Sequence, residues 1–61
     1  MTNFRELVSY ARSVADNHPD LKDEIDGLVD LCWSEIEEGG SIQHEINLCQ
    51  RDIDSLVSEK V

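Results

Sequence analysis

The sequence is poor in basic residues. It has 5 Lys and Arg against 14 Asp and Glu, which gives a formal net charge of -9 at pH 7. An acidic excess of this size disfavours direct contact with DNA, RNA or an anionic membrane surface, because all three are negatively charged themselves. The composition therefore predicts a protein partner with a basic surface, and neither a nucleic acid nor a membrane as a direct partner.

Cysteine is scarce, and long apolar runs are missing. The two cysteines, Cys32 and Cys49, are too few for a disulfide scaffold. Without a run of about 18 apolar residues, a membrane-spanning helix is not expected. The polar start Met1-Thr2-Asn3 does not resemble a signal peptide. We therefore expect a cytoplasmic protein with reduced thiols.

Motifs for catalysis and metal binding are also missing. The pair His44-Glu45 lacks the HExxH spacing of metalloproteases, and Glu35-x-x-Glu38 lacks the histidine of di-iron helices. The acids within residues 16–27 do not match an EF-hand loop. No glycine-rich phosphate loop is present, and no serine has an evident base. We expect no enzymatic activity, no cofactor and no metal site.

Apolar residues recur at helical spacing in three segments, of which the first is predicted over about residues 4–16. Asn3 is a good N-cap, and Glu6 three residues later makes a variant of the capping box. Pro19 should end this helix and begin the next, because proline disfavours helical geometry in the residue before it. The apolar face of the first segment consists of Phe4, Leu7, Val8, Ala11, Val14 and Ala15.

The second and third segments are predicted to form an antiparallel hairpin over about residues 19–38 and 42–59. Gly39 and Gly40 supply a C-cap, and Ser41 can cap the helix that follows. So short a connection places the two helices side by side. Their apolar stripes are Leu21, Ile25, Leu28, Val29, Cys32 and Ile36, and then Ile42, Ile46, Cys49, Ile53 and Leu56, widened by Val57.

The register of this hairpin can be checked from residue numbers, which should have a constant sum across an antiparallel pair. Cys32 with Cys49 and Leu28 with Ile53 both sum to 81. The sequence thus predicts one all-α domain over residues 1–61, in which the N-terminal helix completes a three-helix bundle. An alternative is that this helix swings out and completes the core of a partner.

The predicted second helix holds most of the net charge. Residues 19–38 contain eight acids and one lysine, a net charge of -7, whereas residues 39–61 carry -2. Several of these acids lie opposite the apolar stripe and form an acidic face. This face either keeps a small protein solvated or binds basic residues of a partner. In the second case the carboxylates could imitate a row of phosphates. The candidate binding residues are Asp20, Asp23, Asp26, Asp30, Glu37 and Glu38.

Four large apolar residues fall outside the stripes: Tyr10, Leu31, Trp33 and Leu48. Such residues suggest a contact surface, and Tyr and Trp are favoured at interface hot spots. The alternative is that the N-terminal helix packs broadly enough to cover Trp33 or Leu31, which would make them part of the core.

Cys32 and Cys49 fall in the same predicted layer of the hairpin. A disulfide, half of a metal site and a redox switch are all conceivable for such a pair. A structural zinc site needs four ligands, and His18 and His44 fall at helix ends, away from this layer. We interpret the pair as buried thiols that act as small apolar side chains.

Leu31 to Ile53, LCWSEIEEGGSIQHEINLCQRDI, resembles the small acidic helical accessory proteins of large tailed bacteriophages. The resemblance rests on size, acidity and the Gly-Gly hairpin. It implies a non-enzymatic protein that acts in the host cytoplasm and binds a host or phage protein, in some cases as a DNA-mimic-like inhibitor of a nucleic-acid-handling or defence enzyme. The alternative is a structural homo-oligomer whose acidic face only confers solubility.

Overall fold

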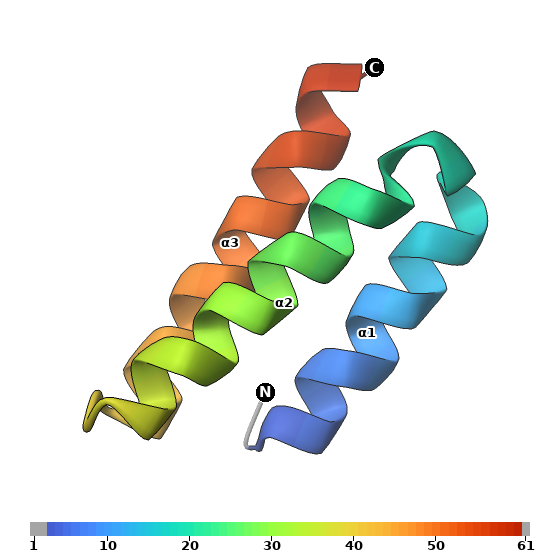
Figure 1. Cartoon of the computed structure of the whole chain (residues 1–61). Helices are drawn as coiled ribbons and strands as arrows, with labels where there is room; N and C mark the ends of the chain where they lie inside the picture. Colours follow the sequence, from blue (N-terminus) through green and yellow to red (C-terminus); the bar gives the residue numbers. More distant parts are fainter. Residues whose placement is uncertain (1–2, 61) are drawn as a thin grey trace.

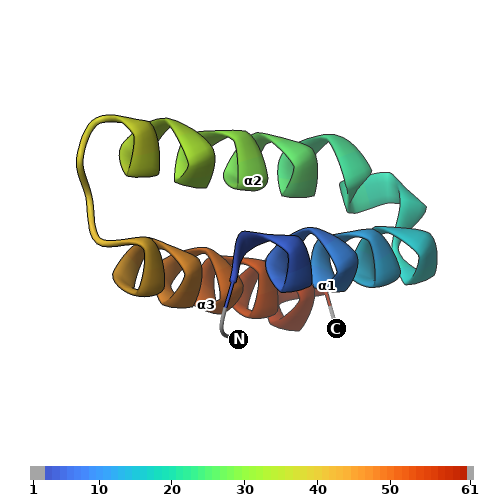
Figure 2. The same cartoon turned by 90° about the horizontal axis from the view of Figure 1, so that it is seen from below.

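The computed structural model describes residues 3–60, and within them the chain is an all-α three-helix bundle. The helices are α1 (Phe4–Asn17), α2 (Lys22–Glu37) and α3 (Ile42–Lys60), with the short 3-10 helix η1 (Pro19–Leu21) before α2 (Figure 1). Every α-helix contacts the other two. Figure 2 shows α2 above a second layer that contains α1 and α3, with the three helix axes running in similar directions. The predicted fold class is confirmed, and the bundle measures 34 × 16 × 16 Å.

Helix α1 begins and ends at the predicted signals. The backbone amide of Glu6 donates a hydrogen bond to Asn3 Oδ1 at 2.9 Å, and Asn3 Nδ2 donates to the Glu6 carboxylate at 3.5 Å. At the other end, the amide of His18 donates to the carbonyl of Val14 at 2.9 Å. The turn at Pro19 is 3-10 rather than α-helical, because the Leu21 amide bonds to the His18 carbonyl three residues back.

The two glycines between α2 and α3 form a Schellman motif. The Gly40 amide donates to the Glu35 carbonyl at 3.0 Å, and the Gly39 amide donates to the Ile36 carbonyl at 3.1 Å. Gly39 has a φ of 101°, in the left-handed region that side chains disfavour. At Gly40 an added Cβ would lie 2.9 Å from the Glu35 carbonyl oxygen. Both glycines are therefore required, for different reasons.

The core consists of residues that the apolar stripes predicted. The buried side chains are Leu7, Ala11, Ala15, Leu21, Ile25, Cys32, Ile46, Cys49 and Ile53. The prediction for Ile42 is wrong: it belongs to the predicted apolar stripe, but 54% of the residue is exposed. It is the first residue of α3, and the hairpin register places it opposite Gly39, which has no side chain to cover it.

Helix α1 packs on the hairpin of its own chain. Leu7, Ala11 and Ala15 are buried in the same cluster as the core residues of α2 and α3. The Tyr10 hydroxyl donates a short hydrogen bond to a carboxylate oxygen of Asp54, which ties α1 to α3. The N-terminal helix thus completes the bundle within a single chain.

Candidate protein-docking groove

The α2–α3 hairpin has two long sides, and α1 covers one of them. On the covered side, the ring of Phe4 from α1 packs against Trp33 of α2, with ring centroids 5.0 Å apart. On the other side, an open hollow of about 210 Å³ is lined by residues of α2 and α3 alone. A second hollow, of about 250 Å³, shares Leu28 and Asp52 with the first and continues along the same two helices.

We call these joined hollows the α2–α3 groove. Its floor is apolar and consists of Leu28, Leu31, Cys32, Leu48, Cys49 and Leu56. Its rim is acidic and consists of Glu24, Glu35, Glu45, Asp52 and Glu59, with Ser55 beside them. The rim draws on both helices, so that acids border the floor on each side.

Helical spacing explains why these residues share a face. On α2, positions 24, 28, 31 and 35 are separated by four, three and four residues, so that they lie above one another on the helix surface. On α3 the same spacing joins positions 45, 48, 52, 56 and 59. The antiparallel register then brings the two rows together along the groove.

Two leucines leave the groove incompletely closed. Leu31 is 57% exposed and Leu48 is 39% exposed. An exposed leucine is ordinary when it stands alone, but these two line the same hollow together with the half-buried Leu28. An apolar floor with a polar border is the composition expected of a protein-binding surface.

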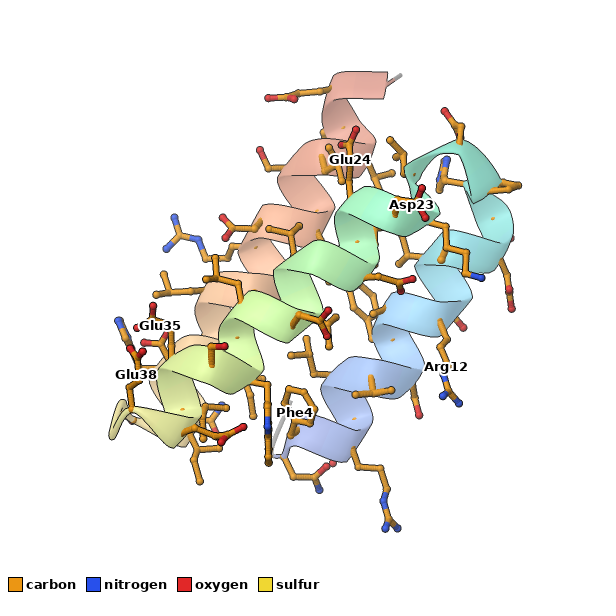
Figure 3. The ribbon with its side chains drawn as sticks, viewed as in Figure 1. Phe4, Arg12, Asp23, Glu24, Glu35 and Glu38 are labelled. Carbon is orange, nitrogen blue, oxygen red and sulfur yellow. The ribbon has the colours of Figure 1, made fainter. Side chains whose placement is uncertain are left out.

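The charge around the groove has a single sign. Among the described residues, no lysine, arginine or histidine lines either hollow. Figure 3 shows Glu24 and Glu35 near opposite ends of α2, both on its side toward α3, whereas Arg12 points away from the bundle on α1. Five carboxylates beside low-dielectric apolar side chains create a negative potential that favours cationic groups.

The two cysteines form the deepest part of the floor. Both are free thiols and only 4% exposed, and Cys49 Sγ donates a hydrogen bond to the Leu28 carbonyl at 3.5 Å. Burial is the main cause that raises the pKa of Cys49 to about 12, and burial also raises the pKa of Cys32. The interpretation as buried thiols is confirmed. Within residues 3–60, no group of three or more His, Cys, Asp or Glu side chains is placed to hold a metal ion.

The acidic residues proposed from the sequence lie outside this groove. Asp20, Asp23, Asp26, Asp30, Glu37 and Glu38 are all exposed, and none of them lines the groove. Asp26 instead lines a separate hollow between α1 and α2 with Arg12 and Lys22. The molecule thus has two acidic surfaces: this outer face of α2, and the rim of the groove, which sequence reasoning missed.

The signal for the rim was present, although it was divided between two helices. Glu24, Glu35, Glu45 and Asp52 each lie three or four residues from an apolar residue of the floor. Such positions flank the contact seam of a helix pair. A charge count by segment favours residues 19–38, with a net charge of -7, and gives little weight to the acids of α3, where residues 39–61 carry -2.

The four apolar residues proposed from the sequence do not form one surface. Leu31 and Leu48 line the same hollow of the groove. Trp33 lies on the side covered by α1, in contact with Phe4, and remains 47% exposed. The Tyr10 side chain reaches from α1 to Asp54 of α3. Its hydrogen bond to Asp54 is the main cause that raises the pKa of Tyr10 from 10.0 to about 12. Of the two roles predicted for Trp33, a contact surface and a core position, the structure shows part of each, because α1 covers part of the side chain and the rest is exposed.

No family model, curated protein or solved structure matches the chain. None of the helices within residues 3–60 has the length and apolar character needed to cross a membrane.

Proposed function

We propose that this protein is a non-catalytic acidic module that binds a basic surface of a partner protein. The observation that carries the proposal is the α2–α3 groove, where the exposed Leu31 and Leu48 share a border of five acids and Ser55, without a basic residue among the described ones. Apolar contact there supplies affinity, and the acidic border supplies selectivity for a cationic partner.

The net charge makes such binding dependent on electrostatics. With a formal charge of -9, the protein attracts a basic partner over distances comparable with the Debye length, which is about 10 Å in about 0.1 M salt. The same charge repels nucleic acid. A partner that normally grips nucleic acid presents a basic surface, so occupation of that surface, and inhibition of the enzyme that carries it, is the specific role we propose.

A second copy of the chain is a poorer occupant of the groove. It would bring its own charge of -9 against the acidic rim, and like charges placed opposite one another weaken association. The exposed apolar residues are therefore assigned to contact with a different, basic protein rather than to a homo-oligomer.

The test is affinity capture from a bacterial lysate on the immobilised protein, in parallel at about 0.05 M and about 0.5 M salt. A basic protein should be retained in the dilute salt and lost in the concentrated salt. The purified partner should then show the same steep dependence of the dissociation constant on salt. Binding that is equally strong in both solutions would contradict the electrostatic basis of the proposal.

A further inference from the structure

We infer that the α2–α3 groove receives an amphipathic α-helix with basic flanks, supplied by a different protein. The inference rests on the proposed function and adds to it the form of the partner and the place where it binds. It follows from three properties of the groove: the bonded backbone groups of its walls, its length and the negative charge of its rim.

The groove suits a helix because its walls offer no free backbone edge. Both walls are α-helices, whose interior amides and carbonyls are bonded within each helix. An extended peptide needs a sheet edge to satisfy its backbone groups, whereas a helical peptide satisfies its own. A helix laid into the groove would be the fourth helix of the assembly, in contact with α2 and α3 and on the side away from α1.

The length of the groove sets the size of this helix. From Glu24 to Glu35, α2 rises about 16 Å, which corresponds to about three helical turns. From Glu45 to Glu59, α3 rises about 21 Å. A helix of about 14 residues therefore covers the floor on this longer side, with apolar anchors at i, i+3 or i+4, and i+7. These anchors would cover Leu31 and Leu48, the two groove residues that are large, apolar and exposed.

The acidic rim specifies what flanks those anchors. Glu24 and Glu35 border the floor along α2, and Glu45, Asp52 and Glu59 border it along α3. Lysine or arginine on both sides of the apolar stripe would place cations against both borders, and their aliphatic stems would cover additional leucine surface. A helix with acidic flanks would be repelled by both rows.

The helices of a second copy do not meet these requirements. α1 has two arginines balanced by Glu6 and Asp16, and its apolar face is already buried in its own bundle. Residues 19–38, which include α2, carry a net charge of -7, and residues 39–61, which include α3, carry -2. The occupant is therefore a helix of another protein.

The experiment uses a synthetic peptide of about 14 residues with leucine at i, i+3, i+4 and i+7 and lysine on both flanks. Two control peptides accompany it: one has the same composition in a non-amphipathic order, and one has glutamate in place of lysine. Titration calorimetry on the folded full-length protein should give saturable binding of the first peptide alone. Equal binding of the reordered peptide, or no binding of the amphipathic basic peptide, would overturn the inference.

Three protein variants then locate the site. Leu31→Gln with Leu48→Gln removes the apolar contact. Glu35→Gln with Asp52→Asn removes one Glu and one Asp from the rim, and the matched control Glu37→Gln with Asp30→Asn removes the same charges from the outer face. Circular dichroism checks that each variant keeps its helices.

We expect the leucine pair and the rim pair each to weaken peptide binding by about tenfold or more, and the outer pair by no more than about twofold. An outer pair that costs as much as the rim pair, or a leucine pair without effect, would overturn the groove assignment. The same variants, tested on a partner captured from the lysate, separate the two proposals. Salt-sensitive capture that responds only to the outer pair would leave the proposed function standing and remove the helix in the groove.

Discussion

Leu31 of α2 and Leu48 of α3 line the same hollow on the side of the hairpin that α1 leaves open, and both remain substantially exposed. Leucines that stabilised the monomer would be buried against the core cluster, as Ile25 and Ile53 are. The position of this pair is therefore better suited to contact with another molecule than to folding of the chain itself.

The first prediction separates these two roles. Replacing Leu31 and Leu48 by glutamine should change the free energy of unfolding by no more than about 1 kcal/mol, because exposed side chains contribute little to stability. Ile53→Ala should cost about 2–5 kcal/mol, because it empties a fully buried site. Urea titration followed by circular dichroism measures both. A loss for the leucine pair as large as that for Ile53→Ala would assign the leucines to the core.

A second prediction concerns the three glycines. Gly39→Ala should destabilise the protein by about 1–2 kcal/mol, because alanine disfavours a left-handed φ. Gly40→Ala should also destabilise it, because the new Cβ meets the Glu35 carbonyl oxygen at 2.9 Å. Gly27→Ala is the control, and it should stabilise α2 by about 0.5–1 kcal/mol, since it removes a helix-interior glycine. At Gly27 the added Cβ would meet no atom within 4 Å beyond its two chain neighbours and the nearby backbone of its own helix. The melting temperatures of the three variants should follow this order. A Gly39→Ala variant whose melting temperature is unchanged would argue against the Schellman turn.

A third prediction follows from the hydrogen bond between Tyr10 and Asp54. The Tyr10 hydroxyl should titrate near pH 12 rather than 10.0, because the Asp54 carboxylate accepts its proton in a hydrogen bond, and burial adds to the effect. Since this is the single tyrosine of the chain, the ultraviolet absorbance of tyrosinate reports it directly. Asp54→Asn should move the titration back toward its ordinary value while the helices remain folded. Titration of the unsubstituted protein at the ordinary value would show that the hydrogen bond is absent.

The raised pKa values of Cys49 and Tyr10 give a fourth prediction, which concerns the dependence of folding stability on pH. Around pH 9.0, the ordinary pKa of the thiol, Cys49 loses its proton in the unfolded chain, whereas in the folded chain burial raises its pKa to about 12. The folded state therefore binds more protons in this window, and its stability should fall as pH rises from about 9 to about 12. Tyr10 adds to the fall above its ordinary value of 10.0.

The measurement is urea unfolding at a series of alkaline pH values. Cys49→Ala, compared with the unsubstituted protein, should show a shallower loss between about pH 9 and pH 10, because the thiol no longer contributes there. Tyr10→Phe should retain that early loss and flatten the later one. Stability that stays level across the whole range would contradict the burial of the thiol.

Much of the fold could be predicted from the sequence because its signals are local. Asn3 and Glu6 cap α1, Pro19 separates α1 from α2, and Gly39 with Gly40 ends α2. Each of these acts over three or four residues, within the reach of pattern reasoning. The predicted register of the hairpin agrees with the structure at Cys32 and Cys49, whose numbers sum to 81 and whose thiols interact in the same hollow.

The groove could not be predicted because it depends on which side of the hairpin α1 covers. Periodicity gives α1 one apolar face, but it does not distinguish the two sides on which that face can pack. The contact of Phe4 with Trp33 settles the choice, and it leaves Leu31 and Leu48 on the open side. The same long-range choice places Tyr10 against Asp54, 44 residues away in sequence.

Binding of a basic amphipathic helix in the α2–α3 groove can be mapped residue by residue. The measurement is the change in amide chemical shifts by NMR as the lysine-flanked peptide is added to isotope-labelled protein. The largest changes are expected around Leu31, Glu35, Leu48 and Asp52, and only small ones at Asp23 and Asp30 and along α1. Changes centred on Asp23 and Asp30, with the groove unaffected, would contradict binding in the groove.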